Sequence, residues 1–336
     1  MAQSLPISDQ LLRWSSRNAR IIAPSITLIA MFIFFTFTTD VFLTSGNLLN
    51  VVTQIGTVAV AATGATFVLL CGEIDLGLAS VATFVGTLSA WFWVNEKWGA
   101  HLGNWGVLVG LLAAVGIGLF NGFCVAYIGI PSFMTTLAML TIAHGLSIYV
   151  TLGKPIFKSP SIAHTLGSAG SRWHGVPWIG IFALGVLIVA ELVLSYTRFG
   201  RYVFMTGGNR EAAEMSGVNT RQIVMMCMMI SSLTAGMAGI LFIGRLNSAN
   251  PSAGGDLLIS TIAAVVLGGT SLFGGEGGIK NTLLGLLIFG ILSNGLNLLP
   301  NLSIYFKEAL QGIILVGALL LNVLALKLEK VQVRAG

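Results

Sequence analysis

The chain has 336 residues, of which 55% are hydrophobic and only 9% are Asp, Glu, Lys or Arg, whereas about 25% of the residues of an average soluble domain are charged. The charged residues are too few to cover the surface of a soluble protein of this length. The composition therefore excludes a soluble enzyme, a nucleic-acid-binding domain and a disordered chain. The formal net charge of +5 is therefore interpreted as a signal of membrane orientation rather than of nucleic-acid binding.

Ten apolar segments follow one another along the chain, and about 20 such residues cross a bilayer. A backbone in hydrocarbon must satisfy its own hydrogen bonds, so these segments form helices or the strands of a closed barrel. The alternating polarity of barrel strands is absent from the sequence. We predict an all-α polytopic membrane protein with a single domain over residues 1–336 and about ten transmembrane helices, at 22–40, 48–70, 75–94, 105–128, 132–152, 176–197, 221–244, 257–272, 281–299 and 303–326.

The basic residues are unevenly distributed between the loops. An even number of spans places both chain ends on one side of the membrane, and most of the 17 Lys and Arg residues then lie on that side. Because basic loops stay in the cytoplasm, we expect residues 1–21, 198–221 and 327–336 to be cytoplasmic.

A weak internal repeat relates two of the predicted helices. The sequences GIGLFNGF at 116–123 and FGILSNGL at 289–296 both place an Asn-Gly pair after a glycine and a few apolar residues. The two helices containing them are predicted to cross the membrane in opposite directions. Such an inverted repeat is typical of transporters.

The segment 200–223 predicts a short helix in a cytoplasmic loop. Asn209 is a favourable N-cap, Glu211 lies where the helix dipole favours an acid, and Gly217 fits the left-handed residue after a helix. A short helix has little stability of its own, and its small alanine face would dock well in a groove of another protein. The candidate coupling residues are Asn209, Arg210, Glu211, Ala212, Ala213, Glu214 and Gly217.

Two acids lie at a predicted span boundary, Glu73 and Asp75. Placing an acidic side chain within the membrane costs free energy, so acids at such positions are candidates for a functional role. They are also residues that cap the start of a helix, where the helix dipole stabilises them. Both interpretations of this pair stay open.

Amide and hydroxyl side chains within the predicted spans suit the passage of a polar, uncharged solute. The candidates are Asn121, Thr135, Thr136, Asn294 and Asn297, with Asn322 as a further member. Each has an alternative role, because such side chains also bond neighbouring helices.

Other chemistry-bearing residues form no catalytic or metal-binding set. The Gly-rich run at 268–278 lacks the Gly-Lys-Ser/Thr ending of a phosphate loop, so we expect no ATP binding by this chain. We interpret the glycines of this run as residues that allow a tight reversal of the backbone. Cys71, Cys124 and Cys227 form no CxxC pair and are expected to be small core residues. The prediction is a chain that is not an enzyme, with no metal and no cofactor of its own.

Several motifs resemble the permeases of ABC importers of the ribose, xylose and galactoside type. Gly-Asn-x-x-Ala-Ala-x-x-x-Gly at 208–217 is similar to the coupling segment of that family, and IPSFMTTLAML at 130–140 is similar to its Ile-Pro-Ser-Phe motif. The Gly-rich region 257–285, LFNG at 119–122 and SNGL at 293–296 also match. The family commonly has Gly-Gly-Ile-Asp-Leu-Ser-x-Gly-Ser where this chain has Gly-Glu-Ile-Asp-Leu-Gly-Leu-Ala-Ser, at 72–80.

The resemblance implies the permease subunit of an ATP-driven, binding-protein-dependent importer for a sugar or polyol in the bacterial inner membrane. It implies three partners: a cytoplasmic ABC ATPase that carries ATP and Mg²⁺, a periplasmic sugar-binding protein, and a second permease subunit, expected to form a homodimer. Two alternatives stay open. The permease could import a nucleoside or a furanosyl signalling compound, or the chain could be a proton-coupled secondary transporter.

Overall fold

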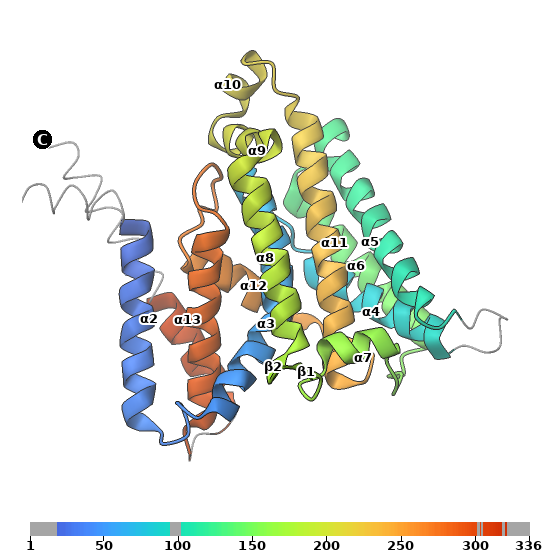
Figure 1. Cartoon of the computed structure of the whole chain (residues 1–336). Coiled ribbons are helices and arrows are strands. Elements are labelled where there is room, and N and C mark those ends of the chain that lie inside the picture. Colours follow the sequence, from blue (N-terminus) through green and yellow to red (C-terminus); the bar gives the residue numbers. More distant parts are fainter. Residues whose placement is uncertain (1–18, 95–101, 301–302, 304, 318–319, 321–336) are drawn as a thin grey trace, which may run out of the picture.

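The computed structural model describes residues 19–94, 102–300, 303, 305–317 and 320. These residues are mostly helical, and Figure 1 shows the helices stacked side by side. The helices are α2 (Ala19–Thr38), α3 (Ser45–Leu70), α4 (Leu78–Val94), α5 (Trp105–Phe123), η1 (Cys124–Ile128), α6 (Ser132–Thr151), α7 (Ser161–Gly167), α8 (Trp178–Tyr196), α9 (Arg198–Gly208), α10 (Arg210–Met215), α11 (Thr220–Leu246), α12 (Gly255–Leu267) and α13 (Ile279–Leu298). Residues 305–317 form a further helix. A two-stranded antiparallel hairpin, β1 (Arg172–Trp173) and β2 (Val176–Pro177), lies between α7 and α8.

The prediction of an all-α polytopic membrane protein is confirmed. Within the described residues, six helices are long and apolar enough to cross a membrane: α3, α5 with its η1 extension, α6, α8, α11 and α13. The other predicted spans coincide with shorter apolar helices, namely residues 24–38, α4, α12 and 305–317. α12 has 13 residues, a length of about 20 Å, which is less than the hydrocarbon thickness of about 30 Å. The total of ten spans therefore stays a prediction.

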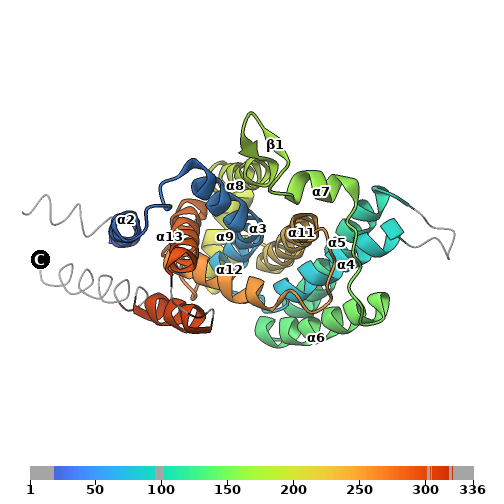
Figure 2. The ribbon, with the colours of Figure 1, turned by 90° about the horizontal axis from the view of Figure 1, so that it is seen from below.

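α3 and α11 form the centre of the helix bundle. In both, most of the apolar stretch is buried, whereas α5, α6 and α8 expose most of theirs. Figure 2 shows α3 and α11 in the middle, with α2 and α6 near opposite edges. Small residues let α11 approach its neighbours: a Cβ atom on Gly239 would lie 1.9 Å from the carbonyl oxygen of Ala82 on α4. Close backbone contact thus fixes α11 against α4.

The two ends of the bundle carry different structures. α9 and α10 lie at one end, at the top of Figure 1, together with the start of α2. α7 and the β1–β2 hairpin lie at the opposite end. α5 runs toward α10 and α13 runs away from it, which are the opposite directions that the predicted inverted repeat needs; the repeat itself stays a prediction.

Candidate functional site

The corner between α9 and α10 is built by the caps that the sequence predicts. Asn209 has an extended backbone that ends α9, and its Oδ1 accepts a hydrogen bond of 3.0 Å from the backbone N–H of Ala212. Gly217 has a φ of +82°, which favours glycine, and its N–H donates to the carbonyl of Glu214. The short helix expected over 209–217 is confirmed as α10.

The two alanines of α10 face different surroundings. Ala213 is only 1% exposed and belongs to the hydrophobic core of the chain, whereas Ala212 is exposed. Next to Ala212 on the outer surface lies Met215, which is 86% exposed. The expectation of one alanine docking face is therefore wrong for Ala213, because that side chain packs inward. The surface available to another protein includes Ala212 and Met215 with the exposed Glu211.

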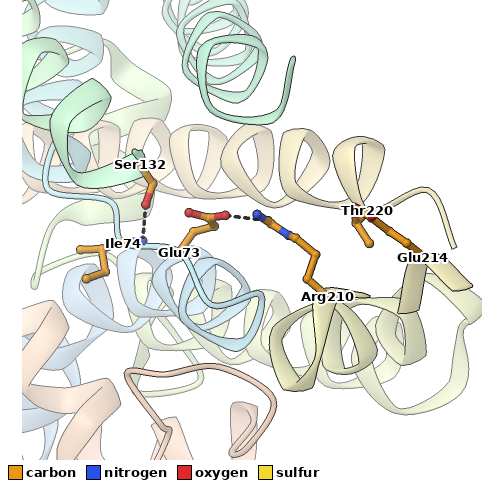
Figure 3. A network of polar contacts seen from close by, with 6 residues as sticks. All are labelled: Glu73, Ile74, Ser132, Arg210, Glu214 and Thr220. Atoms are coloured by element: carbon orange, nitrogen blue, oxygen red, sulfur yellow. Dashed lines mark hydrogen bonds and ion pairs between the residues drawn. The ribbon is translucent and has the colours of Figure 1, made fainter. Parts of the chain in front are cut away.

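α10 is tied to the rest of the chain at both of its ends. The Thr220 hydroxyl, at the start of α11, donates to the Glu214 carboxylate. The Arg210 guanidinium, at the first residue of α10, contacts Oε1 of Glu73 at 2.7 Å. Figure 3 shows both contacts and the position of Glu73 at the turn that follows α3. These two contacts connect α10 to α11 and to this turn.

The turn between α3 and α4, residues 72–77, is irregular and is held by side chains of α6. The N–H of Ile74 donates to Oγ of Ser132 at 3.1 Å, as drawn in Figure 3. The N–H of Leu76 donates to Oγ1 of Thr136 at 3.0 Å. These hydroxyls accept hydrogen bonds from backbone N–H groups that lie outside a helix. Buried backbone N–H groups require such partners.

The two acids of the turn have different roles. The buried Asp75 accepts hydrogen bonds from the N–H of Gly77 at 2.9 Å and from the Ser231 hydroxyl of α11 at 2.7 Å. This geometry supports the capping interpretation for Asp75, directly before α4 begins. Glu73 is not a cap, because its described partner is Arg210. The sequence carries no signal for that contact, since 137 residues separate the two side chains.

The Gly-rich run at 268–278 packs against the ends of α3 and α9. The N–H of Gly275 donates to the carbonyl of Leu70 at 2.9 Å. A Cβ atom on Gly207, in the last turn of α9, would lie 1.9 Å from the same carbonyl oxygen. Gly274 has a φ of +87°. The run is thus the tight reversal expected from its glycines. Its backbone packs closely against the backbones at the ends of α3 and α9.

Two of the predicted pathway residues are hydrogen-bonded within the fold. Asn294 of α13 forms two amide hydrogen bonds, of 2.9 and 3.0 Å, with the buried Asn47 of α3. Thr136 bonds the 72–77 turn and the carbonyl of Ser132. Their side chains join helices, which is the alternative that the sequence left open.

The other pathway candidates do not share one site. Among the described residues, Asn121 and Thr135 are buried with side-chain polar atoms that have no hydrogen-bond partner. Asn297 is exposed. Asn121 lies on α5, which packs against α4 and α11, and Thr135 lies on α6, which packs against α4. Asn297 lies on α13, which packs against α2, α3 and α12. Asn322 falls outside the described residues.

A small pocket, with room for little more than a water molecule, lies between α4, α11 and the start of α12, toward the end opposite α10. None of the predicted pathway residues lines it. Its polar groups are the hydroxyls of Thr83 and Thr87 and the amide of Asn250. No sequence motif singles out these side chains, because threonine also occurs in α3, α6, α11, α12 and α13.

The described residues contain no group of three or more His, Cys, Asp or Glu side chains that could hold a metal ion. Cys71, Cys124 and Cys227 are buried free thiols, in keeping with small core residues. Six apolar helices long enough to cross a membrane, within the described residues, define the class of a multi-pass membrane protein.

Comparisons with known proteins identify the family. Residues 47–319 match the family described as "Branched-chain amino acid transport system / permease component", and the chain belongs to it. It is 36% identical to the ribose import permease protein RbsC of Escherichia coli K12, over 84% of this chain and 87% of that protein. It is 32% identical to the probable ABC transporter permease protein YphD of the same strain, over 96% of both chains.

A third relative is the xylose transport system permease protein XylH of Escherichia coli K12, 28% identical over 94% of both chains. No solved structure matches the chain. The prediction of a membrane permease rather than an enzyme is confirmed by the family. The resemblance to ribose-type and xylose-type permeases is confirmed by these relatives.

Proposed function

We propose that the chain forms the translocation pathway of an ATP-driven, binding-protein-dependent importer for a sugar or polyol in a bacterial inner membrane. The observation that carries the proposal is the protruding α10, capped by Asn209 and Gly217 and presenting Ala212 and Met215 outward, in a chain related to permeases named for ribose and xylose. A helix that is bonded to the rest of the chain at both ends and exposes apolar side chains is suited to bind a partner and to be moved by it.

Three partners follow from this proposal. A cytoplasmic ABC ATPase docks on the end that carries α9 and α10, and it binds the ATP and Mg²⁺, so that this chain needs no cofactor. An extracytoplasmic sugar-binding protein delivers the substrate at the end that carries α7 and the β1–β2 hairpin. A second copy of the permease completes the pathway, which alternates between outward and inward openings at the interface of the two subunits.

The polar groups proposed to accompany the sugar are buried side chains that have no hydrogen-bond partner among the described residues. The side chains of Asn121 and Thr135 retain their hydrogen-bonding capacity among the described residues, and amides and hydroxyls bind a sugar without holding it as tightly as charges would. Thr136 and Asn294 support the pathway by joining helices.

We also propose ten spans with residues 1–21, 198–221 and 327–336 in the cytoplasm. The start of α2 and α9–α10 lie at the same end, in support of this orientation. In a variant with the three native cysteines replaced, a cysteine introduced at the exposed Thr165 of α7 should react with an impermeant maleimide added to intact cells. A cysteine at Met215 should react only after lysis. Equal labelling of both positions in intact cells would reverse the orientation.

The substrate class is tested by competition in cells that express the complete importer. Uptake of a labelled pentose should fall when unlabelled ribose or xylose is added in excess and should be unchanged by an equal excess of a nucleoside. The physical reason is that a nucleoside adds a large base that a pathway shaped for a pentose excludes. Competition by the nucleoside alone would favour the nucleoside or furanosyl alternative over the sugar.

A further inference from the structure

Glu73 and Arg210 connect the tip of the molecule to its interior. Arg210 begins α10 and its side chain is 49% exposed, whereas the Glu73 side chain is only 12% exposed in the turn after α3. Their 2.7 Å contact is a charge-assisted hydrogen bond, which is shorter and stronger than a neutral one. Figure 3 shows the arginine reaching from α10 toward the turn.

The turn that receives this contact is bonded to two other helices at successive residues. Ile74 and Leu76 donate backbone hydrogen bonds to hydroxyls at the start of α6. Asp75, between them, accepts a hydrogen bond from Ser231 in the middle of α11. Residues 73–76 therefore bond α10, α6 and α11, and a displacement of Glu73 acts on the last two through three hydrogen bonds.

α10 is also connected to α11. Its other end is bonded to the start of α11 through Glu214 and Thr220. Beneath it, the last turn of α9 touches the end of α3 at Gly207 and Leu70. With the far end of α10 held by α11 and α9 in contact with α3, a push on α10 is passed to the 72–77 turn at Arg210.

We propose that Glu73 and Arg210 are positioning residues for transport: they pass the movement of α10 to the 72–77 turn, which then shifts α6 and α11. This inference rests on the proposed function, because it takes α10 as the helix moved by the ATPase. Because the Arg210 side chain is half-exposed, replacing it is expected to cost the fold less than replacing the mostly buried Glu73. Loss of the ion pair is expected to uncouple transport from ATP hydrolysis, because the movement of α10 then no longer reaches the 72–77 turn through Arg210.

The experiment measures sugar taken up per ATP hydrolysed by the complete importer in liposomes, with the binding protein present. Glu73→Gln and Arg210→Gln should each lower this ratio by about fivefold or more, with the ATPase still co-purifying. The charge-exchanged double variant, E73R with R210E, should recover part of the ratio. Lys280→Gln is the matched control, because it removes another interhelical ion pair, that of Lys280 with Glu191 at 3.3 Å, and should leave the ratio unchanged.

A wild-type ratio in both single variants would overturn the inference, and so would a double variant no better than either single one. Loss of the ATPase from Arg210→Gln during purification would also overturn it, because Arg210 would then be a docking residue. Since Arg210 is half-exposed, its variant remains informative if Glu73→Gln does not fold. Failure of the proposed function is distinguishable, because wild-type uptake itself would then be independent of ATP.

Discussion

Replacing Ala212 by Trp should separate the permease from its ATPase and abolish uptake. Ala212 is exposed on the protruding α10 beside Met215, and a groove that accepts a methyl group cannot accept an indole without opening a gap around it. Losing such a central contact costs about 2 kcal/mol or more, or roughly 30-fold in affinity. Co-purification of the ATPase with the membrane-inserted variant measures the effect.

The matched control is Ala169→Trp, the same change at an exposed position of the loop between α7 and β1, at the opposite end of the bundle. This variant should retain the ATPase at the wild-type yield. Ala213 is unsuited to the test, because it is buried against the chain's own core and Trp there would disrupt α10 itself. Retention of the ATPase by Ala212→Trp, with uptake intact, would refute the docking surface.

Gly239→Ala should destabilise the bundle severely. The added Cβ would lie 1.9 Å from the carbonyl oxygen of Ala82, and backbone cannot swing aside as a flexible side chain can. α11 would have to separate from α4 near the pocket that both line. We expect a loss of about 3 kcal/mol or more, seen as a lower unfolding temperature in detergent and a lower yield of inserted protein.

Gly116→Ala is the control for this change. Gly116 lies on α5, where an added Cβ meets no atom within 4 Å, so alanine should be neutral or slightly stabilising through its higher helix propensity. If the two variants unfold at the same temperature, the close approach of α4 and α11 is not the contact that holds the bundle together.

Features that depend on neighbouring residues in the chain could be predicted from the sequence. The apolar segments form helices, and Asn209 and Gly217 end α10, because capping is decided within a few residues. The orientation of α10 about its own axis could not be predicted: a helix of two turns carries too short a pattern to show that Ala213 packs inward while Ala212 faces outward.

Contacts between distant segments account for what the sequence did not show. The pairing of Glu73 with Arg210 depends on where α9 places the start of α10, 137 residues further along the chain. The amide pair of Asn47 and Asn294 similarly required the packing of α3 against α13. A polar residue in an apolar helix looks the same in sequence whether it meets a neighbouring helix or a substrate, so Asn294 and Asn121 could not be distinguished.

Uptake of labelled sugar by liposomes that contain the permease and its ATPase tests the central claim most directly. With ATP sealed inside and the binding protein outside, sugar should accumulate, and omission of any one of the three should stop it. Dissipating an imposed pH gradient should change nothing, because the energy comes from ATP. Uptake that persists without ATP and collapses with the pH gradient would contradict the account and establish a proton-coupled transporter instead.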